Sequence, residues 1–182
     1  MKKIFFLVLI PCLIFAISDI YQDNKPKNRT KVSSLLLKNE QKVILKKIFD
    51  KKDFKNQKFE NVTFTECEFK RCDFKNARFD HVIFKNCKFY KSDFTLGYFK
   101  FSKFKHSKVK ESLFLNARFE YCNFVFSDFR YSNFSNAYLK NSKFIKTDLS
   151  KARWINGKIC KERSIDRCLF KKRVKKFHLY IP

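Results

Sequence analysis

Histidine and cysteine, the residues that most often bind metals or act in catalysis, do not occur in this chain at the spacings of a metal site. The histidines are His81, His106 and His178. Neither Cys-x-x-Cys nor His-x-x-x-His spacing occurs, and those spacings are typical of metal sites. Asp and Glu stand mostly beside Lys or Arg, which is typical of surface ion pairs and not of a paired general acid and base. The sequence therefore predicts no enzyme activity, no metal, no cofactor and no small-molecule substrate.

Positive charge is the chemistry in which the chain is rich. It holds 42 Lys and Arg against 17 Asp and Glu, a formal net charge of +25, and the excess is spread along the whole length. Such a field favours nucleic acid, anionic lipid, acidic polysaccharide or an acidic protein surface. An evenly solvated, Lys-rich surface explains the same composition. Charge alone therefore predicts an anionic partner without choosing among these classes.

A period of five residues fixes the elements that must position these charges. Phe or another apolar residue recurs at every fifth position from Phe54 to Ile159, with Val109, Leu139, Leu149 and Trp154 in register. The position two residues earlier is small or narrow in every unit from Val62 to Gly157 and is never Lys or Arg there. A period of five fits neither a helix nor a long strand, so each unit is a short extended piece followed by a corner. Short fixed repeats of this kind wind into solenoids.

Residues twenty positions apart share their chemistry, which predicts four units in each coil. The small column reads Ala77, Gly97, Ala117, Ala137, Gly157. Outer columns agree: Arg78, Tyr98, Arg118, Tyr138 and Lys158 alternate cation with ring, and His81, Phe101 and Tyr121 are successive flat rings. Stacked neighbours about 4.8 Å apart make each column a favourable ladder.

These residues resemble the pentapeptide repeat family, whose unit is a small residue, a polar one, Leu or Phe, and two variable ones. The resemblance covers residues 52–161, although Lys52 and Gln57 depart from it at the small position. It implies an all-β solenoid, a right-handed quadrilateral β-helix of about five regular coils. Well-known members are acidic rods that imitate DNA and occupy a bacterial type II topoisomerase. Because this chain is strongly basic, we expect no topoisomerase mimicry.

The segments outside the repeat have other expected roles. Residues 1–18 read as a secretory signal peptide, with Lys2 and Lys3 before an apolar run, so we expect a periplasmic or secreted protein. An uncleaved N-terminal membrane anchor is the alternative. Residues 19–32 are expected to be a flexible leader. Residues 33–51 carry an apolar stripe at roughly helical spacing, which predicts an N-terminal capping helix. Residues 162–182 are expected to form a basic C-terminal cap or tail.

The cysteines divide between the core and the cap. Cys67, Cys72, Cys87 and Cys122 stand at small inner positions, where a buried thiol is an ordinary space filler. Cys67 and Cys87 lie one coil apart, so their spacing also admits a bridge. Cys160 and Cys168 fall at the end of the repeat and beyond it. They are the favoured pair for a disulfide that pins the C-terminal cap.

The outer faces are where function is expected. A basic aromatic face is the predicted binding site, since cations interleaved with rings suit an anionic ligand; it comprises Arg78, His81, Tyr98, Lys100, Phe101, Arg118, Tyr121, Tyr138, Lys140 and Lys158. The same ladders can instead serve only to hold coils together. A plainer electrostatic patch holds Lys70, Arg71, Lys88, Lys91, Lys108, Lys110, Arg130 and Lys151. A face with few charges is the candidate for self-association or a homodimer and contains Leu96, Leu113, Leu115 and Ile155.

Three functions follow as hypotheses. The leading one is a non-catalytic, exported binding or scaffold rod whose basic aromatic face engages an anionic macromolecule or an acidic protein surface. The second is a structural, self-assembling protein without a soluble ligand. The third is a nucleic-acid binder, which requires a cytosolic or host-delivered protein.

Overall fold

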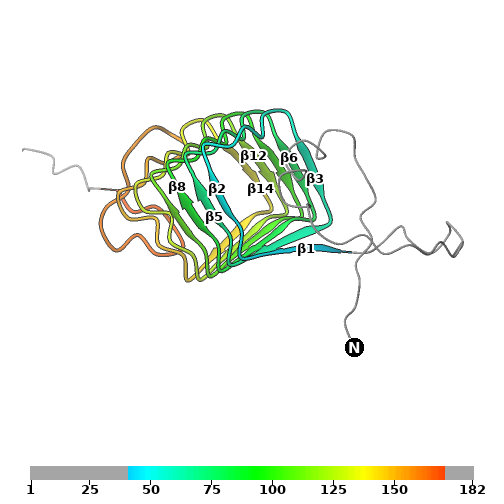
Figure 1. Cartoon of the computed structure of the whole chain (residues 1–182). Coiled ribbons are helices and arrows are strands. Elements are labelled where there is room, and N and C mark those ends of the chain that lie inside the picture. The colour runs from blue at the N-terminus through cyan, green and yellow to red at the C-terminus, as the bar shows by residue number, and fades with distance from the viewer. Residues whose placement is uncertain (1–40, 171–182) are drawn as a thin grey trace, which may run out of the picture. The chain divides into compact units, whose positions relative to one another are not determined.

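A computed structural model of the chain describes residues 41–170, which wind into a stack of coils with strands on three of four sides (Figure 1). Sheet A runs β1 (Lys42–Leu45), β4 (Val62–Thr65), β7 (Ile83–Lys85), β10 (Lys103–Lys105), β13 (Asn123–Val125) and β15 (Lys143–Ile145). Sheet B runs β2 (Ile48–Asp50), β5 (Glu68–Lys70), β8 (Lys88–Tyr90) and β11 (Lys108–Lys110). Sheet C runs β3 (Lys58–Glu60), β6 (Arg78–Asp80), β9 (Tyr98–Lys100), β12 (Arg118–Glu120) and β14 (Tyr138–Lys140).

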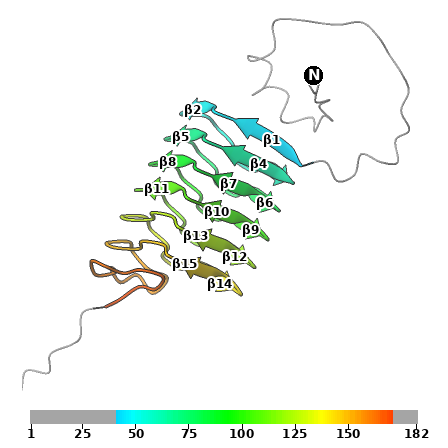
Figure 2. The same ribbon diagram turned by 90° about the horizontal axis from the view of Figure 1, so that it is seen from below.

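The fourth side, called here the bridge face, has single parallel bridges in place of strands. They join Asp53, Asp73, Asp93, Leu113, Asn133 and Arg153 in turn. Every strand pair is parallel, and each residue pairs with the residue twenty positions away, as in Phe104 with Phe124. The predicted coil of four pentapeptides is therefore confirmed, and Figure 2 shows the strands of sheet A succeeding one another along the axis.

The core is built from stacked phenylalanine rings. Rings one coil apart lie face to face: Phe74 to Phe94 and Phe94 to Phe114 have centroids 4.7 and 4.9 Å apart, each with a 2° interplanar angle. Rings on neighbouring sides of one coil meet edge to face, as Phe69 and Phe74 do at 5.6 Å. Because offset-stacked and edge-to-face pairs are the favourable arrangements, phenylalanine can occupy most of the centre positions.

The small inner residues contact the preceding coil. Ser102 Oγ donates to the carbonyl of Phe79 at 3.1 Å and accepts from the amide of Val82 at 3.1 Å. Cys87 and Cys122 donate through sulfur to the carbonyls of Phe64 and Phe99 in the same way. In the described residues no buried side-chain nitrogen or oxygen lacks a hydrogen-bond partner. The inner position therefore accepts Ser and Cys as readily as Ala, since a partner carbonyl is always in reach.

Each corner is made by a residue in the left-handed region. The second residue after every centre from Ile44 to Leu149 has a positive φ near 50–60°, including bulky ones such as Leu96 at 60° and Tyr131 at 63°. Only Gly and, to a lesser degree, Asn adopt this conformation at low cost. The Asn residues at 56, 76, 116 and 136 share one corner column, where Asn76 also donates a side-chain hydrogen bond to Asn56 at 2.8 Å.

The expected helix over residues 33–51 is wrong over its described part. Residues 42–50 form β1 and β2, and Ile44 and Phe49 occupy centre positions that stack over Phe64 and Phe69. The small position of this first coil holds Lys42, Lys47, Lys52 and Gln57. In later coils the side chain at that position contacts the preceding coil, so only small residues fit. Within the described residues no coil precedes the first one, and long polar side chains therefore have room there. Residues 33–40 lie outside the described part.

The regular coil ends at residue 156, five residues before the predicted end at residue 161. Gly157 has a φ of 74°, and the chain folds back so that Arg153 bridges Ile159 in the antiparallel sense. Ile159 is 55% exposed and is not the inner centre that the period predicts. Gly157 likewise lies at a turn, with open space around its α-carbon, and is no core spacer. Trp154 ends the ring stack against Phe134 and Phe144.

Residues 157–170 lie over the last coil as a cap. The amide of Leu149 donates to the Ser164 carbonyl at 2.8 Å, and Lys151 donates to the Cys160 carbonyl at 3.0 Å. Cys160 and Cys168, the pair proposed from the sequence, form a disulfide. The cap therefore satisfies backbone groups that the last coil leaves without a following coil.

Residues 1–40 and 171–182 lie outside the described part, and with them the expected signal peptide, leader and basic tail. Between residues 41 and 170 there is no helix long and apolar enough to cross a membrane.

Candidate functional site on the outer faces of the coils

Sheet C carries most of the predicted basic aromatic face. Arg78, Tyr98, Arg118 and Tyr138 lie side by side on β6, β9, β12 and β14. Asp80, Lys100, Glu120 and Lys140 form the parallel column two residues further along each strand. Lys158 is separate from this ladder, because the chain has already turned at Gly157 and β14 is the edge strand of the sheet. Its ammonium group lies 5.9 Å from the Phe170 ring centroid in the cap.

Arg118 is held by its neighbours on sheet C. Its guanidinium carbon lies 5.0 Å from the Tyr138 ring centroid and 6.0 Å from that of Tyr98, and Nε donates to Glu120 Oε1 at 2.6 Å. Tyr98 donates to the other Glu120 oxygen at 3.0 Å. Hydrogen bonding from Arg118 lowers the pKa of Glu120, which is 8% exposed. Arg118 therefore joins three coils, and its charge is largely neutralised at the surface.

The flat rings His81, Phe101 and Tyr121 form a ladder on the corner between sheets C and A, called here the first ring ladder. The centroids of His81 and Phe101 are 4.9 Å apart, and those of Phe101 and Tyr121 are 5.1 Å apart. His81 Nδ1 lies 2.7 Å from Asp80 Oδ1. Lys100 stands 5.3 Å from the Phe101 centroid. These three rings stack on one another, so both faces of the middle ring, Phe101, are covered.

The electrostatic patch predicted from the sequence lies on sheet B and the adjoining corners, where most of its cations are paired. Lys70 and Lys88 both contact Glu68, at 3.1 and 2.7 Å. Further pairs join Arg71 with Asp50, Lys91 with Glu111, Lys110 with Asp128, Arg130 with Asp128 and Asp148, and Lys151 with Glu162. Paired charges project a weak field, so this patch is less attractive to an anion than its composition suggests.

The bridge face carries the predicted self-association residues in its C-terminal half. Leu96 is 57% exposed, Leu113 and Ile155 are also exposed, and Leu115 is half-buried. The N-terminal half is more charged than expected, because Lys55 lies between Asp53 and Asp73 and Lys75 between Asp73 and Asp93. The apolar part of this face is therefore small.

Sheet A, which the sequence-based prediction did not single out, has the least compensated positive charge. Its outward side chains include Lys85, Lys103, Lys105 and Lys143 and no Asp or Glu. None of these four lysines forms an ion pair with another residue of the described range 41–170. Writing the columns that begin at Thr63 and Thr65 in steps of twenty would have found this face.

Two ring ladders border sheet A along its length. The first ring ladder lies at one corner. At the other corner His106 stacks on Phe126 with centroids 5.1 Å apart, and Lys146 lies 5.1 Å from the Phe126 centroid; these three form the second ring ladder. A shallow hollow of about 280 Å³ lies where sheet A meets the first ring ladder, with Lys103 at its rim.

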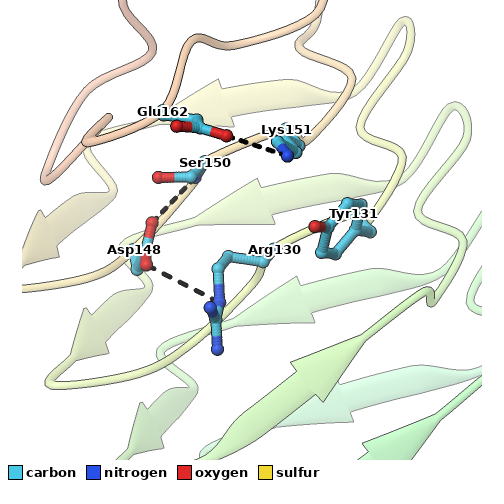
Figure 3. Close-up of a pocket in the computed structure, with 6 residues that line it drawn as sticks. All are labelled: Arg130, Tyr131, Asp148, Ser150, Lys151 and Glu162. Carbon is cyan, nitrogen blue, oxygen red and sulfur yellow. Dashed lines mark hydrogen bonds and ion pairs between the residues drawn. The ribbon is translucent and has the colours of Figure 1, made fainter.

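A second hollow lies beside the cap, and the four core thiols are buried but differ in acidity, because a hydrogen bond with Cys87 lowers the pKa of Cys67. This hollow has a volume of about 190 Å³. Figure 3 shows that, among the residues lining it, Arg130 contacts Asp148 and Lys151 contacts Glu162. Burial raises the pKa of Cys72 and of Cys122 to about 11, so both stay protonated at neutral pH. Residues 41–170 contain no cluster of three or more His, Cys, Asp or Glu suited to a metal ion.

Comparison with known proteins identifies similar sequences and folds. A family model described as pentapeptide repeat region matches residues 46–114, and a second, pentapeptide repeats, matches residues 132–153. Rfr23, a pentapeptide repeat protein from the cyanobacterium Cyanothece 51142, is 10% identical with a TM-score of 0.53, over 62% of this chain and 88% of that one. This likeness confirms the predicted right-handed quadrilateral β-helix.

Two further solved structures are more distant. HetL, from the cyanobacterium Nostoc sp. strain PCC 7120 and involved in heterocyst differentiation regulation, is 12% identical with a TM-score of 0.39, over 66% of this chain and 62% of HetL. QnrB1, a plasmid-mediated fluoroquinolone resistance protein, is 18% identical with a TM-score of 0.32, over 62% of this chain and 77% of QnrB1. No curated protein sequence matches the chain significantly. From its repeat, its coil and these two family models, the chain belongs to the pentapeptide repeat family.

Proposed function

We propose that this protein is a non-catalytic binding rod that engages an anionic macromolecule outside the cytoplasm. The observation that carries the proposal is the pattern of ion pairing: acids neutralise many cations of sheets B and C, whereas the four lysines of sheet A face outward with no acid on any strand of that sheet. An uncompensated row of charges on a rigid surface attracts a polyanion and holds it in one place.

Sheet C adds to this surface in part. Lys100 and Lys140 adjoin the first ring ladder and so continue the positive field of sheet A around the corner. They alternate along their column with Asp80 and Glu120, which weakens their attraction for an anion. The sequence-based binding face therefore contributes its corner, while Arg118 and Tyr98 serve mainly to join coils.

Export belongs to the same proposal, because the expected signal peptide in residues 1–18 would place the rod among the anionic polymers of the bacterial envelope or outside the cell. No topoisomerase is a partner of a rod with this charge. N-terminal sequencing of the protein from its own cells tests export: a chain that begins near Asp19 supports it, and an intact Met1 in the cytosol contradicts it.

Binding is tested with a linear polyanion that has no aromatic rings, such as dextran sulfate. We expect saturable binding by the whole chain at low salt. Changing Lys85, Lys103, Lys105 and Lys143 to Gln should weaken it at least about tenfold, since each phosphate-like contact releases a counterion. The urea denaturation midpoint of the variant should be unchanged, because these lysine side chains form no ion pair with another residue of the range 41–170.

A matched variant separates a site from general charge. Changing Lys70, Lys88, Lys91 and Lys110 to Gln removes the same charge from sheet B and its adjoining corner, where each lysine is paired. We expect this variant to lose affinity by less than about threefold. Equal losses in both variants, or no saturable binding by the wild-type chain, would contradict the proposal.

Self-association is the second candidate, and the exposed Leu96, Leu113 and Ile155 on the bridge face favour it. It requires no soluble ligand, and the assembled rods would then be structural.

A further inference from the structure

We propose that the anionic partner of sheet A is a lipid bilayer surface, on which the rod lies side-on with the two ring ladders at the lipid interface. This inference rests on the proposed function, because it names the chemical class that the same cationic face binds. It adds that the rod lies with sheet A against the bilayer and that the rings at the corners take part in binding, neither of which follows from charge alone.

The outward side chains of sheet A combine cations with aliphatic groups. Besides the four lysines, the outward positions of sheet A hold Thr63, Thr65 and Asn123 and the aliphatic residues Val43, Leu45, Ile83, Val125 and Ile145. Val43, Leu45 and Ile145 are exposed. Sheets B and C each mix acids with their bases on the outward positions. A surface of Lys and aliphatic groups without acids matches an anionic headgroup layer above hydrocarbon.

The ring ladders project from both edges of this face. Phe101 is 39% exposed and Phe126 is 47% exposed, and Tyr121 lies beside Phe101 on the first ring ladder. The side chains of both ladders are exposed at the corners on either side of sheet A. Aromatic rings are favoured at membrane interfaces, where their apolar edges enter the headgroup boundary.

The way the rings are stacked decides against bases and sugars. Both faces of Phe101 are covered, by His81 at 4.9 Å and Tyr121 at 5.1 Å. The faces of Phe126 are covered by His106 and by the ammonium group of Lys146, each at 5.1 Å. Bases of single-stranded nucleic acid bind by stacking on an open ring face. On Phe101 and Phe126 only the ring edges are free, and an edge can be buried in lipid without displacing the neighbouring ring.

Vesicle binding tests this inference. The whole chain is mixed with vesicles of phosphatidylcholine alone or with about 30% phosphatidylglycerol, and the bound fraction is measured by co-sedimentation. We expect binding only to the anionic vesicles, and a loss of at least about tenfold when Lys85, Lys103, Lys105 and Lys143 become Gln. Variants are compared in the same chain, so that any contribution of the apolar residues 4–17 is common to all.

The ring variant separates lipid from other polyanions. Changing Phe101 and Phe126 to Ser should weaken binding to anionic vesicles by about tenfold or more, because the apolar edges are lost, and leave dextran sulfate binding within about twofold. The control changes Tyr90 and Tyr131, exposed rings away from sheet A, to Ser and should leave vesicle binding unchanged.

Each contrary outcome identifies what fails. Tight dextran sulfate binding without vesicle binding would overturn the lipid inference and keep the proposed function, with an acidic polysaccharide as partner. Tighter binding to a single-stranded oligonucleotide than to dextran sulfate, lost on the Phe101→Ser and Phe126→Ser change, would show that bases stack on these rings and would overturn it too. Binding to neither vesicles nor polyanions would overturn both proposals.

Discussion

Single side chains in this protein serve either the inside or the outside of a coil, and their place in the five-residue unit decides which. Phe104 is a centre and is fully buried between Phe84 and Phe124. Phe101, three residues earlier, is a corner with an exposed ring. The same residue type therefore stabilises the fold in one position and shapes the surface in the other.

Truncation of these two phenylalanines should give very different losses. Phe104→Ala leaves a cavity in a closely packed ring stack, and we expect the free energy of unfolding to fall by about 3–5 kcal/mol. Phe101→Ala should cost less than about 1 kcal/mol, because its ring is only partly buried. Urea denaturation followed by circular dichroism measures both. Similar losses would show that the interior is not the tightly stacked core described here.

The partly buried carboxylate of Asp128 accepts two side-chain hydrogen bonds from Arg130 and should make stability depend on pH. Burial alone would raise the pKa of its carboxyl, but hydrogen bonds from Arg130, at 2.8 and 2.9 Å, outweigh burial and hold that pKa below its usual value. Stability from a lowered pKa is present above the unfolded-state value, about 3.9, and is lost as pH falls through the folded-state value.

The change Asp128→Asn should therefore lower the free energy of unfolding by about 1–2 kcal/mol at neutral pH. The difference from wild type should shrink as pH falls below about 4. Asp53→Asn is the control, since that side chain is 66% exposed and its ion pair is worth little. A constant difference between wild type and Asp128→Asn from neutral pH to strong acid would contradict the role given to Asp128.

Strands and caps show how far the sequence predicts this fold. The five-residue period and the twenty-residue columns predicted the coil of four units and its register, because steric limits on the inner positions act on every coil alike. The first coil was not predicted, because Lys42 and Lys47 occupy the positions that hold small residues in the later coils. The end of the last coil was also predicted wrongly, because Gly157 fits the five-residue pattern. Glycine suits an inner position as well as a turn, and the structure shows that Gly157 lies in a turn.

Surface function was harder to predict than the fold. The sequence identified columns of charge but not which charges are paired, because pairing depends on neighbours from adjacent strands and corners. Glu120 neutralises Arg118 on the face chosen for binding, whereas sheet A keeps its lysines free. The acid-free columns of sheet A are present in the sequence, but they contain no aromatic residue, and the prediction of a binding face depended on cations interleaved with rings.

The C-terminal cap should open as a separate unit when its disulfide is removed. Changing Cys160 and Cys168 to Ala releases a loop with a sequence separation of 8, and we expect a loss of about 2–3 kcal/mol from the greater entropy of the open loop. Hydrogen exchange should quicken at the amides of Leu149 and Lys151, which donate to the cap, and stay slow in β8 and β10. Unchanged protection at Leu149 would show that the cap holds without its disulfide.

The coils of residues 41–156 form a rod with a positively charged side, sheet A, and a partly apolar side, the bridge face. The two candidate functions use different sides of it. Self-assembly through the bridge face predicts oligomers that grow with concentration and disappear when Leu113 and Leu115 become Ser. A binding rod predicts a monomer in both forms. Sedimentation velocity over a wide concentration range distinguishes them, with Val125→Ser on sheet A as a control of similar polarity change. Oligomers that depend on Leu113 and Leu115 would make the structural function the leading one.

The most direct test of the central claim is the salt dependence of polyanion binding, which counts the charges in the contact. The logarithm of the binding constant for dextran sulfate is measured against the logarithm of salt concentration for the wild-type chain and for the variant with Gln at 85, 103, 105 and 143. We predict that the variant's slope is smaller by about 3, since each lysine in contact accounts for about 0.7–0.9. Equal slopes for the two proteins would contradict the account, because the lysines of sheet A would then not touch the anion.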